Sequence, residues 1–264
     1  MSAPDLISIH ALRRLVGTPA SPVIVDVRTP EDFADDPRMI PGSLLVGHGD
    51  APSMALPAGR KVVIVCQKGL KISQGVAALL RARGVAAEAL EGGQFGWRDA
   101  GAPMIDTHAL PALEAGGTRW VTRSRPKIDR LGCCWLVRRF IDPDATFLFV
   151  ERSQVEPVAE RFGATAFDIA ASAWGDREGR CSFDAFLANL SLHDPALDVM
   201  AEILRAADLG AAETVREAPG WLAVMLGLSR LERDANRQLD QAMAMHDALY
   251  RWARDARDET HGHA

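Results

Sequence analysis

A run of β-branched residues ends in a cysteine and continues directly into a loop and a helix, and this order leaves few folds open to the chain. The run Lys61–Cys66 is followed by the glycine-bearing loop Gln67–Lys71, and an Ala/Leu-rich helical pattern extends from Ile72 to Arg83. An unbroken apolar run of this length is typical of a strand in a parallel sheet with both faces covered. Cys66 is therefore predicted to lie between a buried strand and the N-terminus of a helix.

This position favours a reactive cysteine. The free backbone N–H groups of a first helical turn and the helix dipole stabilise a thiolate relative to a thiol. Lys68 and Lys71 add positive charge close to Cys66. The alternative is a buried structural cysteine, because free cysteines are often core residues.

Four segments around this cysteine resemble the rhodanese (sulfurtransferase) family in both order and spacing. The resemblance covers about the first hundred residues. It implies a rhodanese-like parallel sheet flanked by helices. The segments resemble the family's first core strand and the turn after it, its Ile-Pro-Gly turn, its active loop, and its final strand and closing helix: Val23–Arg28 with Glu31–Phe33, Ile40–Ser43, Cys66–Lys71, and Leu90–Gly93 with Trp97.

The resemblance implies sulfurtransferase chemistry at Cys66. The cysteine would take a sulfane sulfur from a small-molecule donor such as thiosulfate, form a persulfide, and pass the sulfur to a thiol or protein acceptor. A thiolate is needed because the thiol is a poor nucleophile, and loop N–H groups would face the outer sulfur as in an oxyanion hole. No cofactor is implied. The predicted active loop consists of Gln67, Lys68, Gly69, Leu70 and Lys71.

Three further residues are implied to support this site, namely Asp26, Arg28 and Ser73. The family commonly has a hydroxyl residue six positions after the cysteine, but here that position is Ile72 and the hydroxyl follows as Ser73. We therefore expect the hydroxyl contact with the persulfide to be displaced or lost. Ile72 also excludes the related phosphatases and arsenate reductases, whose longer loop is closed by an arginine at that position.

Strand and helix patterns alternate in the first half, which indicates a parallel α/β sheet. The strands are predicted at Val23–Val27, Val62–Cys66 and Ala87–Leu90, and the helices at Ser8–Val16, Ile72–Arg83 and Gln94–Ala100. Helical patterns dominate from Ser182 onward, with Ser182 and Asp194 as predicted N-caps. These later helices are predicted at Phe183–Leu190, Pro195–Ala207, Pro219–Leu226 and Asn236–Arg257.

The length of 264 residues suggests two domains, each large enough to bury its own core. We predict a rhodanese-like domain at residues 1–105, a linker at 106–118, a mainly helical α+β domain at 119–257 and a tail at 258–264. The net charge of −5 argues against general nucleic-acid coating. Four cysteines without secreted-style spacing fit a reducing cytoplasm, and no segment has the signature of a signal peptide or a membrane span.

The second half resembles the chromate-resistance ChrB family along nearly its whole length. The resemblance begins in residues 120–142 and continues at Thr146–Val150, Phe167–Ile169, Cys181–Asp184 and Met245–Tyr250. A rhodanese domain followed by such a domain resembles a known fusion type. The resemblance implies a link to chromate resistance without supplying a mechanism.

Basic residues cluster at the start of this half. Residues 119–139 hold seven basic side chains and one acid, Asp129, which gives a local charge of +6. Pro126 suits the first position of a helix, whose positive end binds sulfate-like anions such as chromate. Surface ion pairs are the alternative, and nucleic-acid contact is less favoured because no reading motif is present. The predicted oxyanion-binding residues are Arg123, Arg125, Lys127 and Arg130.

Cysteine and histidine side chains in this half could also carry chemistry. Cys133 lies in the apolar run Leu131–Val137, so burial is expected, and a redox role is the alternative. No metal site is predicted, because this half has no Cys-x-x-Cys or His pair at zinc-ligand spacing. His246 falls on the apolar face of the last helical pattern and is expected in the core. The sequence thus predicts a sulfurtransferase, and the competing hypothesis is a chromate-binding sensor whose rhodanese half relays sulfur or redox state.

Overall fold

The computed structural model describes residues 5–111, 117–170, 172–177 and 179–259. The chain divides into two compact units, one formed by Met1–Leu113 with Arg139–Pro143 and the other by Glu114–Arg138 with Asp144–Ala264. Residues 112–116 of the predicted linker and 260–264 of the predicted tail lie outside the described residues. The linker and tail boundaries therefore remain predictions.

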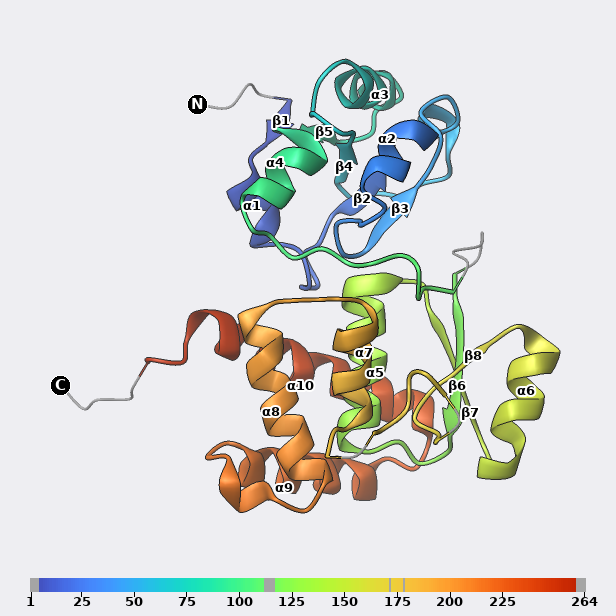
Figure 1. The fold of residues 1–264 in the computed structure, drawn as a ribbon, viewed down its shortest axis with the longest axis vertical. Coiled ribbons are helices and arrows are strands. Elements are labelled where there is room, and N and C mark those ends of the chain that lie inside the picture. Colours follow the sequence, from blue (N-terminus) through green and yellow to red (C-terminus); the bar gives the residue numbers. More distant parts are fainter. Residues whose placement is uncertain (1–4, 112–116, 171, 178, 260–264) are drawn as a thin grey trace. The chain divides into compact units, whose positions relative to one another are not determined.

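The first unit is built on a five-stranded sheet in which every neighbouring pair is parallel. The order β1-β5-β4-β2-β3 contains all three predicted strands (Figure 1). The two edge strands were not predicted, because two or three residues are too few to show a period. The strands are β1 Leu6–Ile7, β2 Val23–Asp26, β3 Ser43–Leu45, β4 Val62–Val65 and β5 Ala87–Leu90.

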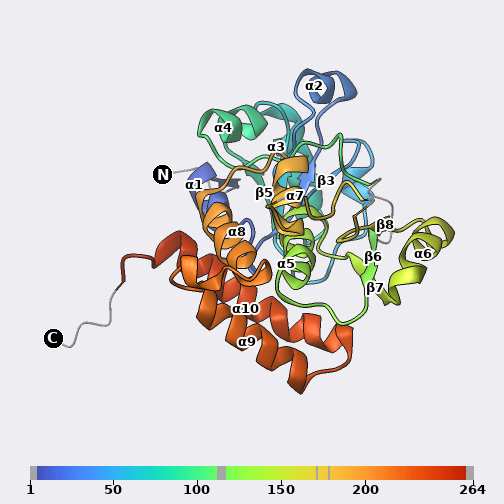
Figure 2. The same ribbon diagram turned by 60° about the horizontal axis from the view of Figure 1, so that its bottom comes forward.

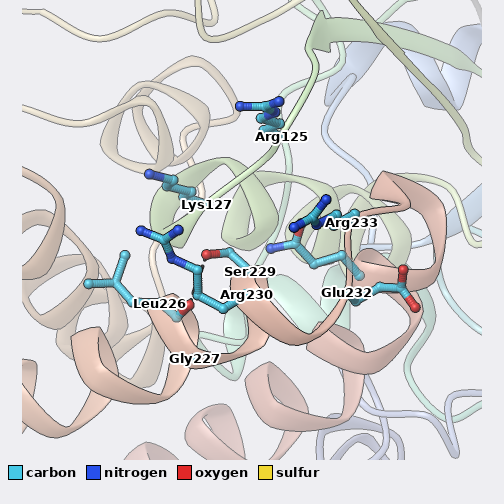
Figure 3. Close-up of a pocket in the computed structure, with 9 residues that line it drawn as sticks. Arg125, Lys127, Leu226, Gly227, Ser229, Arg230, Glu232 and Arg233 are labelled. Carbon is cyan, nitrogen blue, oxygen red and sulfur yellow. Dashed lines mark hydrogen bonds between the residues drawn. The ribbon is translucent and has the colours of Figure 1, made fainter.

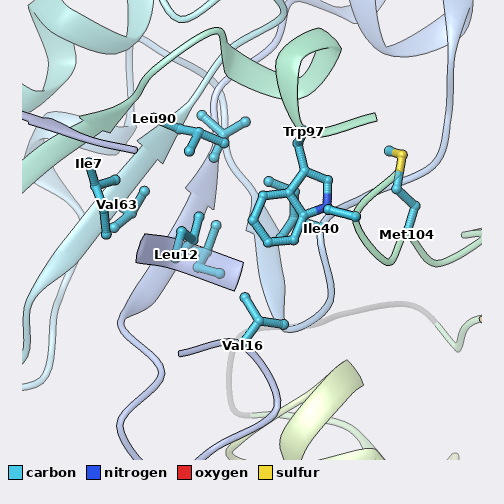
Figure 4. Packing of buried hydrophobic residues seen from close by; sticks show 11 residues of the cluster. Ile7, Leu12, Val16, Ile40, Val63, Leu90, Trp97 and Met104 are labelled. Atoms are coloured by element: carbon cyan, nitrogen blue, oxygen red, sulfur yellow. The ribbon is translucent and has the colours of Figure 1, made fainter. Parts of the chain in front are cut away.

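Helices cover both faces of this sheet, as the unbroken apolar strands predict. Along β4, Val63 and Val65 pack with Leu12 of α1 and Trp97 of α4 (Figure 4). Val62 and Ile64 point to the other face, where α3 packs. The predicted rhodanese-like fold of parallel sheet and flanking helices is therefore confirmed. Its helices are α1 Ile9–Arg13, α2 Pro30–Asp35, α3 Lys71–Ala82 and α4 Gly93–Asp99, with a short 3-10 turn, η1, at Ala51–Ser53.

The second unit combines a small parallel sheet with a larger helical layer. The predicted mainly helical α+β second domain is therefore confirmed. The sheet has the order β7-β6-β8, with β6 Arg119–Arg123 between β7 Thr146–Val150 and β8 Thr165–Ala166. Helix α5 packs against α7, α8 and α10, and α9 packs against α8 and α10 (Figure 2). The helices are α5 Ile128–Leu136, α6 Val155–Phe162, α7 Ser182–Asn189, α8 Pro195–Asp208, α9 Ala218–Leu231 and α10 Ala235–Asp255, and the shorter turns are η3 Arg152–Gln154 and η4 Ala212–Thr214. A further turn, η2 Val137–Ile141, follows α5 and leads into the Arg139–Pro143 segment, which belongs to the first unit.

Two predicted helix starts in this unit are wrong. Ser182 is the first residue of α7 and does not cap it, because Cys181 is the N-cap and the Ser182 hydroxyl donates to Asp168 instead. Pro126 precedes α5, whose N-cap is Lys127. The cap at Asp194 is confirmed, since its carboxylate accepts from the N–H groups of the first turn of α8. None of the described helices is both long and apolar enough to span a membrane.

Candidate functional site

Cys66 follows β4 directly, at the carboxyl edge of the parallel sheet. The register pairs Val65 with Asp26, so the ends of β4 and β2 meet at this edge. Ligand sites in parallel α/β sheets form at such edges, where the strands end and loops begin. Only 5% of Cys66 is exposed, and its side chain packs with the core on the α3 face. The strand therefore holds the cysteine rigidly at the start of the loop.

Ser73 supplies a hydroxyl to the sulfur although it stands one position later than the family pattern. In the thiol form the Cys66 Sγ–H donates to Ser73 Oγ at 3.1 Å, and the Ser73 hydroxyl donates to the Leu70 carbonyl at 3.3 Å. Because α3 begins at Lys71, Ser73 lies in its first turn, and helical side chains lean toward the N-terminus. Ser73 is fully buried. The shift by one position thus preserves a hydroxyl contact with the sulfur.

Backbone contacts between two loops fix the shape of the active loop. The N–H groups of Gln94 and Phe95 donate to the Cys66 and Gln67 carbonyls at 2.9 and 3.0 Å. Gly69 and Gly93 both have positive φ. A Cβ on Gly69 would lie 2.6 Å from the Gly93 nitrogen, and a Cβ on Gly93 would overlap the Cys66 carbonyl. Glycine is therefore required at both positions, for conformation and for space.

The loop offers donors and positive charge to an anionic sulfur. Within the described part of the chain, the backbone N–H groups of residues 68–72 have no hydrogen-bond acceptor. Lys68 and Lys71 are exposed on the same loop and form no ion pair with a described carboxylate. Unpaired N–H groups at a helix start bind anions, so this loop is suited to a persulfide and to an anionic donor.

Asp26 and Arg28, predicted as supporting residues, form a buried ion pair of 2.7 Å. The Arg28 guanidinium also donates to the Asp36 and Arg38 carbonyls at 2.6 and 2.9 Å. Among the described residues neither side chain is hydrogen-bonded to Cys66. The pair therefore connects the end of β2 to the segment that follows α2.

Gln94 is a supporting residue that the sequence did not identify. It is buried at the start of α4, and its side-chain amide donates to the Asp36 carboxylate at 3.0 Å. Hydrogen bonds from Arg38 and then from Gln94 lower the pKa of Asp36 to about 2. The segment that follows α2 is thereby tied to the helix whose N–H groups hold the active loop. The sequence signal was a Gly-Gly pair followed by an amide residue, Gln94.

In the second unit, two of the four predicted oxyanion-binding residues already have a carboxylate partner. Asp168 accepts from Arg123 at 2.9 Å, pairs with Arg130, and accepts from the Ser182 hydroxyl at 2.9 Å. Asp129 accepts from the Ser182 backbone N–H, and burial raises the pKa of its carboxyl well above the usual range. Arg123 and Arg130 thus tie β6 and α5 to the loop after β8.

Arg125 and Lys127 are placed differently. Both are exposed and line a pocket of about 660 Å³ together with Arg230 and Arg233 (Figure 3). Of the four predicted oxyanion-binding residues, Arg123 and Arg130 are therefore paired with a carboxylate, whereas Arg125 and Lys127 line this basic pocket.

Cys133, predicted as a redox candidate, is fully buried and is a free thiol, as are Cys134 and Cys181. Burial raises the pKa of all three thiols above the usual range, which keeps them protonated at neutral pH. Protonated buried thiols react slowly, so a redox role for Cys133 is not favoured. In the described ranges no three His, Cys, Asp or Glu side chains are grouped to hold a metal ion.

Two protein families match the chain. The model of the rhodanese-like domain matches residues 8–100, and the model of the ChrB C-terminal domain matches residues 120–253. Protein ChrB of Cupriavidus metallidurans is 34% identical over 135 residues, which is 51% of this chain and 40% of that protein. The match thus spans less than half the length of this relative.

Solved structures similar to this chain include a rhodanese-like domain protein from Staphylococcus aureus, 31% identical with a TM-score of 0.31, covering 35% of this chain and 90% of that one. A protein of unknown function from Rhodopseudomonas palustris is 29% identical with a TM-score of 0.34, over 38% and 83%. Thiosulfate sulfurtransferase from Pseudomonas aeruginosa is 25% identical with a TM-score of 0.34, over 39% and 19%. The chain carries a rhodanese-like domain and belongs to the family of the ChrB C-terminal domain.

Proposed function

We propose that the protein is a cytoplasmic rhodanese-type sulfurtransferase linked to chromate resistance, with Cys66 as the persulfide carrier. The rhodanese-like match supports the chemistry, and the family of the second unit supports the physiological link. The observation that carries the proposal is the loop after β4, where Cys66 adjoins backbone N–H groups without acceptors among the described residues. An anionic sulfur is the species that such a loop stabilises.

The proposed reaction has two displacements at sulfur. The Cys66 thiolate attacks the outer sulfur of thiosulfate, a new S–S bond forms, and the old S–S bond breaks as sulfite leaves with the electron pair. An acceptor thiolate or cyanide then attacks the outer sulfur of the persulfide, and Cys66 leaves as a thiolate. Each step exchanges one bond to sulfur for another, so no cofactor or external oxidant is needed.

The surroundings of Cys66 suit both steps. The Ser73 hydroxyl can donate to the sulfur once the thiol proton has left, because it lies 3.1 Å from Sγ. Lys71 and Lys68 are exposed and can attract the dianionic donor to the loop. The burial of Cys66 protects the persulfide from water and leaves the loop as the route to the sulfur.

Intact mass spectrometry after incubation with thiosulfate tests the proposal. Wild type should gain the mass of one sulfur atom, and cyanide should remove it. Cys66→Ser should gain nothing, whereas Cys134→Ser, which removes a fully buried thiol, should load like wild type. If correctly folded wild type gains no sulfur, the proposed function is wrong.

The competing hypothesis is a sensor that binds chromate or sulfate through the basic segment of the second unit. The pairing of Arg123 and Arg130 with Asp168 leaves Arg125 and Lys127 as its candidates. Thermal stabilisation by chromate that survives Cys66→Ala and is lost in the Arg125→Ala, Lys127→Ala double variant would favour the sensor. Absence of stabilisation by either oxyanion would contradict it.

A further inference from the structure

The second unit contains a basic pocket formed by segments far apart in sequence. Arg125 and Lys127 reach it from the segment before α5, and the last two turns of α9 and the segment after it supply the opposite wall (Figure 3). Its volume of about 660 Å³ lies in the range of roughly 300–1,000 Å³ that small-molecule sites occupy. The lining residues of that wall are Leu226, Gly227, Ser229, Arg230, Glu232 and Arg233, with Gln238 from α10.

The pocket holds an excess of uncompensated positive charge. Four of its lining side chains are cations and one, Glu232, is an acid. The Glu232 carboxylate accepts from the Asp234 backbone N–H at 2.9 Å. Throughout the described residues the four cations, Arg125, Lys127, Arg230 and Arg233, form no ion pair.

Other arginines of the same unit show the contrast. Arg123 and Arg130 pair with Asp168, and Arg205 pairs with Asp184. These arginines each have a carboxylate partner, whereas none of the four pocket cations is paired with the one lining carboxylate, Glu232, or with another described acid. Exposed cations scattered over a surface are ordinary. Four cations from two segments far apart in sequence, unpaired among the described residues and gathered around one pocket, are better explained by binding of an anion.

Buried contacts hold the two walls of the pocket together. Gln238 is 2% exposed, and its side-chain amide donates to the Pro126 carbonyl at 3.0 Å. This bond joins the start of α10 to the segment that carries Arg125 and Lys127. Lys127, which lines the pocket, is also the N-cap residue of α5.

We propose that this pocket binds a small polyanion that carries at least two phosphate-like groups. The net charge of the lining calls for more than one negative charge, and the volume exceeds what a single tetrahedral oxyanion fills. Guanidinium groups bind phosphate oxygens with two parallel hydrogen bonds, which favours phosphates over diffuse anions. This binding site is separate from Cys66 and does not depend on sulfur transfer.

Calorimetric titration of the full chain with inorganic pyrophosphate and with sulfate tests the ligand class. Pyrophosphate should bind at least about tenfold more tightly than sulfate or chromate, since engaging a second anionic group contributes about 1.4 kcal/mol or more. Equal affinities would contradict the requirement for two groups. No binding of pyrophosphate would overturn the site itself.

A matched pair of glycine substitutions on α9 tests the location. Gly227 lines the pocket and a Cβ there meets nothing, so Gly227→Asp places a carboxylate among the cations without a clash. Gly220 is equally open but does not line the pocket. Gly227→Asp should weaken pyrophosphate binding at least about tenfold, whereas Gly220→Asp should not change it. Equal binding by both variants would refute the proposal.

Two further measurements distinguish this pocket from the Cys66 loop and from a nucleic-acid surface. Cys66→Ser should bind pyrophosphate like wild type. A failure of the sulfur-transfer proposal would therefore not count against the proposed polyanion site. Duplex DNA that binds the wild type and Gly220→Asp but not Gly227→Asp, while pyrophosphate fails to bind, would make a nucleic-acid backbone the occupant, and the small-polyanion proposal would then be wrong.

Discussion

Replacing Ser73 with alanine should slow persulfide formation while leaving the fold intact. The Ser73 hydroxyl lies 3.1 Å from the Cys66 sulfur, and both residues are buried, so water cannot replace the lost donor. A hydrogen bond to a charged group contributes about 1.5–3 kcal/mol. At about 1.4 kcal/mol for each tenfold change, the thiolate would form persulfide roughly 10- to 150-fold more slowly.

The rate is measured by quenching thiosulfate reactions at intervals and following the added sulfur by mass. Ser43→Ala is the matched control, because Ser43 is 2% exposed in the same unit and its hydroxyl donates to the Ile40 carbonyl at 2.7 Å. It should lower stability like Ser73→Ala without slowing the reaction. An unchanged rate in a folded Ser73→Ala protein would refute the role assigned to this hydroxyl.

Two other predictions concern stability. Burial lowers the pKa of His246 to about 4 from an unfolded value near 6.5. The unfolded state therefore binds more protons between these values, and unfolding of the second unit should become easier by up to about 3 kcal/mol as pH falls from 7 to 4. Unfolding is monitored by tryptophan fluorescence in a Trp97→Phe background. The control His193→Asn, which replaces an exposed histidine, should keep this pH dependence of stability, and His246→Phe should lose it. Gly93→Ala should destabilise the first unit by about 1–3 kcal/mol and block sulfur loading, because its Cβ would overlap the Cys66 carbonyl at positive φ. Gly59→Ala, which has positive φ but open space, should load normally, and loading by both variants would contradict the argument.

The sequence predicted the centre of the first unit better than its edges. Strands β2 and β4 are almost wholly buried, so their apolar runs are long enough to recognise, and β5 is buried except at Glu88. Strand β1 is two residues long, and only its pairing with β5 defines it. The contact of Ser73 with Cys66 could not be predicted either, because it depends on the residue at which α3 begins.

In the second unit the last four helices, α7 to α10, were predicted from their periodicity, although α9 extends past the predicted end at Leu226 to Leu231, and α6 was not predicted. Of the cations around the basic pocket, only Arg125 and Lys127 were predicted. The last helix buries Leu239, Ala242 and His246 on one face, as the spacing indicated. Arg230 and Arg233 gave no signal, because nothing in a local pattern shows that they face Arg125 across a pocket. Similarly, the partner of Arg123 and Arg130 is Asp168, which lies outside the basic segment.

The four cysteines differ in a way that bears on the sulfur acceptor. Burial raises the pKa values of Cys133, Cys134 and Cys181, and a thiol must be ionised to attack a persulfide. The pKa of Cys181 is raised further by the nearby carboxylates of Asp129 and Asp184. Cys66, in contrast, adjoins the loop whose N–H groups at residues 68–72 have no acceptor among the described residues. If Cys66 carries sulfane sulfur, we propose that its acceptor is a thiol of another molecule and none of these three buried cysteines.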